Sequence, residues 1–103
     1  MTCEELEQLL APVGIPFALH HWERPPAMPY GVYFNDYTEN FEADNRAYAV
    51  ISHVYIELYT RQRDHSLETR LEGILDGVDL YWDKDSVYVD SLRAYKTTYE
   101  IEV

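Results

Sequence analysis

The hexapeptide Val54-Tyr55-Ile56-Glu57-Leu58-Tyr59 alternates between aliphatic side chains and side chains that are aromatic or acidic. A period of two residues is typical of a β-strand with one buried face and one half-exposed face. The hexapeptide lies inside the longest strand that the sequence predicts, residues 47–60, where Val50 extends the aliphatic face. Residues 95–103 show the same alternation and predict a final strand. One of its faces carries Tyr95, Thr97, Tyr99, Ile101 and Val103.

Two stretches with apolar residues at helical spacing predict helices that cover this sheet. The first begins with Thr2 and Glu5, which fit a capping box in which each side chain satisfies the other's backbone amide. Its apolar stripe comprises Leu6, Leu9, Leu10 and Val13. The second helix is capped by Asp64 or Ser66 and ends at Gly77. Its apolar stripe comprises Leu67, Leu71, Ile74 and Leu75.

Shorter strands complete the predicted sheet. Residues 17–22 and 30–35 indicate two strands separated by a proline-rich connection, because proline cannot donate a ladder hydrogen bond. A hairpin is expected at residues 80–89, with its turn at residues 83–86. The order of these elements predicts an α+β fold for a single domain, residues 1–103: an antiparallel or mixed β-sheet with two helices packed on one face.

The charge balance excludes some classes of partner. Eight Lys and Arg residues stand against 19 Asp and Glu residues, and the net charge of −11 repels nucleic acid phosphates and anionic lipid. Cys3 is the single cysteine, so no internal disulfide forms. The sequence shows neither a signal peptide nor the run of about 20 apolar residues that a membrane span needs. We therefore expect a soluble, cytoplasmic protein with no membrane partner.

No residue pattern in the sequence indicates catalysis, a cofactor or a metal. His20 and His21 are neighbours and would point to opposite sides of a strand, whereas metal ligands on one strand need a spacing of two. The serines lie outside any nucleophile-elbow motif, and the four glycines build no phosphate-binding loop. We therefore expect no enzyme activity and no catalytic, cofactor-binding or metal-binding residues.

Two sets of side chains are candidates for binding a partner protein. Residues 36–46 are acidic and aromatic, and this segment is about as long as an unstructured loop becomes in a compact domain. Its carboxylates, which are candidates for facing a partner or a lumen, are Asp36, Glu39, Glu42 and Asp44. The candidate interface aromatics are Tyr37, Phe41, Tyr55 and Tyr59. Two simpler interpretations stand beside these: a solvated hairpin, and tyrosines that are ordinary outer-face residues of a sheet.

Six pieces of the sequence carry a family resemblance. They are Gly14-Ile15-Pro16-Phe17, His20-His21-Trp22-Glu23, Pro29-Tyr30-Gly31-Val32-Tyr33, His53–Thr60, Leu67–Leu75 and Tyr99–Val103. Across nearly the whole chain, these pieces resemble the small tail-completion proteins encoded in the head–tail module of long-tailed phages and prophages of Gram-positive bacteria. Those proteins in turn resemble the tail terminators.

The resemblance implies an α+β domain that forms a hexameric ring on the tail tube, stops growth of the tube and docks the filled head. The partners that the resemblance implies are other copies of the chain, the tail tube protein and the head-connector protein. DNA would pass through the ring without specific binding. It places the protein in the host cytoplasm during assembly and then in the neck of the virion.

Such a ring needs two different, complementary patches on each subunit, and an acidic lumen would repel DNA phosphates and let the duplex slide. Three other functions stay open at this point. They are another neck protein, such as a head–tail adaptor or stopper; an acidic DNA mimic that inhibits a DNA-binding enzyme; and a small ligand-binding module.

Overall fold

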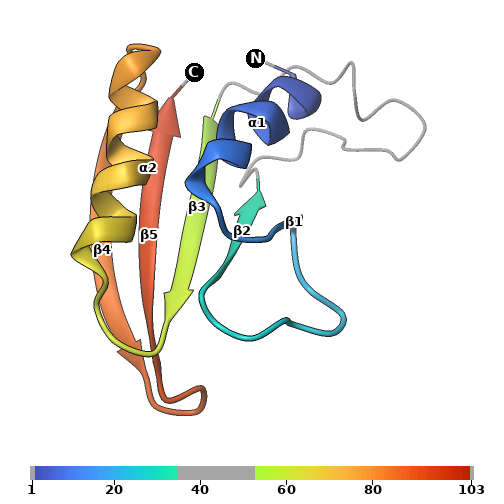
Figure 1. The fold of residues 1–103 in the computed structure, drawn as a ribbon, viewed down its shortest axis with the longest axis vertical. Helices are drawn as coiled ribbons and strands as arrows, with labels where there is room; N and C mark the ends of the chain where they lie inside the picture. The colour runs from blue at the N-terminus through green and yellow to red at the C-terminus, as the bar shows by residue number, and fades with distance from the viewer. Residues whose placement is uncertain (1, 35–52, 103) are drawn as a thin grey trace.

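The computed structural model describes residues 2–34 and 53–102 (Figure 1). Helix α1 (Cys3–Leu10) continues into a 3-10 turn (Ala11–Val13), and strands β1 (Phe17–Leu19) and β2 (Tyr30–Phe34) follow. The remaining elements are strand β3 (His53–Thr60), helix α2 (His65–Gly77), and strands β4 (Tyr81–Val89) and β5 (Ala94–Glu102).

The strands form one five-stranded sheet in the order β1-β2-β3-β5-β4. Strand β1 runs parallel to β2, and the other neighbouring pairs are antiparallel, so the sheet is mixed. Both helices lie on the same face of the sheet (Figure 1). The expected α+β fold, with two helices packed on one face of a mixed sheet, is confirmed.

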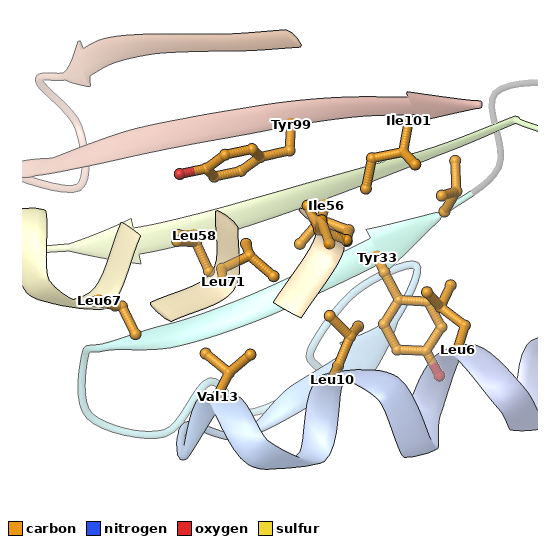
Figure 2. Packing of buried hydrophobic residues seen from close by; sticks show 12 residues of the cluster. Leu6, Leu10, Val13, Tyr33, Ile56, Leu58, Leu67, Leu71, Tyr99 and Ile101 are labelled. Carbon is orange, nitrogen blue, oxygen red and sulfur yellow. The ribbon is translucent and has the colours of Figure 1, made fainter. Parts of the chain in front are cut away.

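The core lies between the helices and the sheet. The register pairs Ile56 of β3 with Tyr33 of β2 on one side and with Tyr99 of β5 on the other, so these side chains form a row beneath the helices (Figure 2). The helices contribute five buried leucines that pack against this row: Leu6, Leu10, Leu67, Leu71 and Leu75. Removing this apolar surface from water is the main force that holds helices and sheet together. The predicted apolar stripes are therefore the buried faces of both helices.

Helix α1 begins at the predicted capping box. Thr2 Oγ1 accepts a 3.1 Å hydrogen bond from the Glu5 amide, and Glu5 Oε1 accepts a 2.9 Å bond from the Thr2 amide. The chain turns after the helix at Gly14, whose φ of +87° is easily reached only without a Cβ atom. Arg70 of α2 then donates a 2.5 Å hydrogen bond from Nη1 to the carbonyl of Val13, which ties the 3-10 turn after α1 to α2.

Two predicted strand boundaries are wrong. Residues 83–86 are not a turn, because β4 runs unbroken from Tyr81 to Val89 and the hairpin turns at residues 90–93. Charged residues fit within β4 because it is an edge strand, where charged side chains are common. The first strand ends at Leu19 because His20 has a φ of +70° and leaves the extended conformation.

The second face of the sheet is the one that neither helix covers. Its side chains change from aromatic to acidic between β2 and β4. The ring of Tyr59 stacks on Tyr30 with centroids 5.1 Å apart, and Tyr55 stacks on Phe34 at 5.4 Å. The rings of Trp22 and Tyr30 pack in a T-shaped arrangement, and Trp22 donates a 2.9 Å hydrogen bond from Nε1 to the Gly31 carbonyl. Over β4 and β5 the same face carries the carboxylates of Asp83, Asp85, Glu100 and Glu102. The second face is thus aromatic over β2 and β3 and acidic over β4 and β5.

Candidate functional site

Strand β4 is one of the two edge strands of the sheet that residues 2–34 and 53–102 form. Among the described residues it pairs with β5 alone, since it is last in the strand order. An edge strand presents a row of backbone N–H and C=O groups that can recruit another β-strand. The opposite edge, β1, is three residues long, whereas β4 has nine residues. Strand β4 is therefore the longer template for strand pairing.

Exposed apolar side chains gather along the same edge. In the part of the chain that the structure describes, the large hydrophobic residues left exposed are Val78, Tyr81, Val87, Tyr88 and Leu92. All of them lie between the end of α2 and the start of β5, and Tyr81 is 72% exposed. Tyr81, Val87 and Tyr88 lie on β4 itself, and Val78 and Leu92 lie in the segments just before and after it. Scattered exposed apolar residues are ordinary, but a concentration along one edge is typical of an interaction surface. We refer to β4 together with these five residues as the β4 edge.

The side of β4 that faces away from the helices is acidic. Asp83 lies directly opposite Glu100 of β5, and like charges at opposite positions destabilise a strand pair. Asp85 follows two residues later on the same face, opposite Thr98. On the same face, Lys96 Nζ lies 3.8 Å from Glu57 Oε2, and His53 Nε2 of β3 lies 3.0 Å from Glu100 Oε1. Neither of these groups contacts Asp83 or Asp85 within ion-pair distance. The face beside the β4 edge therefore carries an excess of negative charge that a cation from outside would offset.

A shallow hollow of about 350 Å³ lies on this face beside β4. Its lining includes Asp83, Asp85, Val87, Lys96 and Glu100. Carboxylates at the rim suit the charged head of a Lys or Arg side chain, and Val87 suits its apolar stem. The hollow thus has the chemistry to receive a long basic side chain from a strand placed next to β4.

On the helix side of β4, charged groups satisfy one another. Lys84 Nζ lies 2.7 Å from Glu72 Oε2 and 3.1 Å from Glu68 Oε1. Arg63 makes two 3.0 Å hydrogen bonds to the Glu68 carboxylate, and the Tyr99 hydroxyl donates a bond to Glu72. Buried charges are tolerated when they are paired and hydrogen-bonded in this way. This ion-pair cluster locks α2 onto β4 and β5.

The ion-pair cluster shifts the pKa values of its members. Burial acts to raise the pKa of Glu68, which is 4% exposed, but the hydrogen bonds from Arg63 and Lys84 outweigh burial and hold the pKa below its ordinary value. The hydrogen bond to Glu72 raises the pKa of Lys84, and burial together with the same carboxylate raises the pKa of Tyr99. Each of the three shifts moves a pKa away from neutrality, whereas a general acid or base works best with a pKa near the operating pH.

The predicted interface residues divide into two groups. Those outside the described residues are Asp36, Glu39, Glu42, Asp44, Tyr37 and Phe41. Tyr55 and Tyr59 are half-buried on the second face, and the Tyr59 hydroxyl donates a 2.8 Å hydrogen bond to Glu57. Strand β5 lies between these tyrosines and β4, although Tyr55 also lines the hollow beside β4. Their role as interface aromatics stays a prediction.

Other features limit what residues 2–34 and 53–102 offer. Within these ranges no three His, Cys, Asp or Glu side chains converge as metal ligands do, and no helix is long and apolar enough to cross a bilayer. A second hollow, of about 450 Å³, lies between α1 and β1, where Tyr33 and Glu7 line it. The Tyr33 hydroxyl donates a 2.5 Å hydrogen bond to Glu7, so these two polar groups already engage each other.

Comparison with known proteins points to no family. No protein-family model, no curated protein and no solved structure matches this chain.

Proposed function

We propose that this chain is a structural protein of a long-tailed phage or prophage, which caps the tail tube and joins tail to head as an oligomeric ring. The observation that carries an assembly role is the β4 edge, where a nine-residue strand comes last in the described sheet and exposed apolar side chains gather along it. Surfaces of this kind mark sites of protein association. The assignment to the phage tail rests on the sequence resemblance.

The ion-pair cluster supports a role in binding rather than in chemistry. Arg63 and Lys84 offset the charges of Glu68 and Glu72, and the hydroxyl of Tyr99 is held by Glu72. These bonds fix α2 against the β4–β5 hairpin. A surface that is rigid before binding loses less conformational entropy when a partner arrives. The cluster therefore prepares the β4 edge for association.

A closed ring needs two different patches on each subunit. The aromatic part of the second face, with Tyr55 and Tyr59, is the candidate for one of these patches, and the β4 edge is the candidate for contact with a partner protein at one end of the ring. In a hexameric ring of this kind the tail tube protein and the head-connector protein bind the two ends. Acidic residues around the lumen repel DNA phosphates, so that the duplex passes without specific binding.

The test combines the purified chain with the tail tube protein of the same phage. Negative-stain microscopy and light scattering should show hexameric rings at the ends of tubes of limited length. The Val87→Glu variant places a charge on the β4 edge and should leave tubes uncapped and over-long. Ala27→Glu adds the same charge at an exposed position between β1 and β2 and should cap normally. A chain that never associates with tubes, or Val87→Glu capping as well as wild type, contradicts the proposal.

A further inference from the structure

We infer that the β4 edge binds an extended segment of a different polypeptide, which pairs with β4 as an added strand and carries Lys or Arg at two alternate positions. This inference rests on the proposed function, because it names the kind of partner segment that the assembly interface accepts. It specifies both the backbone conformation and the side-chain pattern of that segment.

The backbone argument comes from the length and position of β4. Strand β4 has nine residues in an extended conformation. In an edge strand the backbone N–H and C=O groups of alternate residues point away from the neighbouring strand, so β4 offers several of these groups to a partner. A partner that pairs with them gains main-chain hydrogen bonds without requiring the edge to rearrange. Strand β4 is also held from behind by Lys84, which bonds Glu68 and Glu72 of α2.

The side-chain argument comes from the order of residues on the acidic face of β4. Tyr81, Asp83, Asp85 and Val87 follow one another at every second position on that face. An added strand places its own alternate residues beside them, at a distance where opposite charges attract. The matching segment therefore reads apolar, basic, basic, apolar at every second residue. Its basic side chains lie over the hollow beside β4, which Asp83 and Asp85 line together with Glu100, whose Oε1 lies 3.0 Å from His53 Nε2.

A second copy of this chain fits the β4 edge poorly. The other described sheet edge, β1, comprises Phe17, Ala18 and Leu19, so it is short and carries no basic residue. Pairing two β4 strands symmetrically about Asp85 places the two Asp85 carboxylates directly opposite, and pairing about Ser86 makes them diagonal neighbours. Both arrangements bring like charges together. A basic segment from another protein meets neither problem.

The test uses a peptide with the sequence Val-Thr-Lys-Thr-Lys-Thr-Val, blocked at both ends, and the isotope-labelled full chain. Titration should shift the NMR signals of β4 and slow amide exchange along it, and added salt should weaken binding because the carboxylates are exposed. The double variant Asp83→Asn with Asp85→Asn should bind about five- to tenfold more weakly, since each cross-strand charge pair contributes modestly. A peptide with Glu in place of Lys should not bind.

Two N-methylated peptides separate strand pairing from simple charge attraction. One is methylated on each even-numbered amide and the other on each odd-numbered amide, so both keep the same side chains and charges. A strand beside β4 uses only one set of amides for hydrogen bonds, and so one peptide should bind and the other should not. Equal binding of the two peptides overturns the inference.

The remaining outcomes distinguish this inference from the proposed function. If the chain alone forms a dimer by light scattering, and Val87→Glu abolishes that dimer, a second copy occupies the β4 edge and the inference is wrong. If tubes are capped but the signals shifted by the peptide lie away from β4, the inference is again wrong while the capping role stands. Peptide binding on β4 without any capping supports the inference and removes the proposed function.

Discussion

The Tyr99 hydroxyl donates a 2.6 Å hydrogen bond to Glu72 Oε2, the same oxygen that lies 2.7 Å from Lys84 Nζ. Tyr99 is fully buried in the middle of β5, so its hydroxyl has left water for this bond. One carboxylate oxygen of α2 thus bonds both the central strand β5 and the edge strand β4. The strength of this junction should be measurable in the stability of the whole fold.

Replacing Tyr99 by Phe should lower the free energy of unfolding by about 1.5–3 kcal/mol, because a hydrogen bond to a charged group is lost and Glu72 loses a donor. Chemical denaturation followed by circular dichroism measures the change. The control is Tyr95→Phe, which removes a hydroxyl from a partly exposed ring on the same strand. Equal losses in the two variants would show that the Tyr99–Glu72 bond contributes nothing specific.

Acid should destabilise the protein through Glu68. Arg63 and Lys84 hold its pKa in the folded state below the ordinary value, so the carboxylate stabilises the fold when ionised. This contribution is complete above the unfolded-state pKa of about 4.3 and is lost as the pH falls through the lower folded-state pKa. Denaturation series between pH 7 and pH 2 should show stability falling below about pH 4.3.

The Glu68→Gln variant should be less stable at pH 7 by about 1–2 kcal/mol, because Arg63 loses the carboxylate that it bonds twice and Lys84 keeps only Glu72. It should also lose less stability in acid than wild type does. Glu23→Gln, at an exposed position between β1 and β2, should keep the wild-type acid response. An unchanged acid response in Glu68→Gln would assign acid sensitivity to other carboxylates.

A side chain at Gly31 should destabilise the fold. A Cβ atom added at this position meets the ring of Phe17 on the neighbouring strand at far less than contact distance. Gly31→Ala should therefore destabilise the fold by about 1–3 kcal/mol, as overpacking does. In the Phe17→Leu background the same substitution should have a smaller effect, because the ring is gone. A double-mutant cycle with no coupling between the two sites would reject this explanation.

Local patterns in the sequence predicted local structure well. The capping box joins Thr2 and Glu5, three residues apart, and both hydrogen bonds form as expected. Strand β3 shows its alternation of burial because neighbouring residues of any strand point to opposite faces. These features depend on residues that lie close together in the chain, and a sequence pattern records such relationships directly.

Strand β4 was mispredicted because its support comes from distant residues. Asp83-Lys84-Asp85-Ser86 resembles a polar turn. Lys84 is nevertheless held in the sheet by carboxylates 12 and 16 positions earlier in the chain, and Ser86 is held by a 2.9 Å hydrogen bond with Thr97. No local pattern reveals these contacts.

The candidate site was beyond sequence reasoning for a related reason. The sequence indicated that Tyr55 and Tyr59 occupy an outer face, but their stacking on Phe34 and Tyr30 depends on the pairing of β2 with β3. The β4 edge depends on strand order, because only the complete sheet defines which strand comes last. Only the strand order shows that the exposed apolar residues of β4 lie at an edge of the sheet.

The contact between β2 and β3 also makes this chain a natural candidate for splitting. Five residue pairs, from Tyr30–Tyr59 to Phe34–Tyr55, join an amino-terminal part to a carboxyl-terminal part, and Arg70 reaches across to the carbonyl of Val13. A polypeptide cut between residues 34 and 53 should therefore reconstitute from its two halves when they are co-expressed, with only one half tagged for purification. Gly31→Ala in the shorter half should weaken this recovery, so that the pair would work as a tunable split reporter.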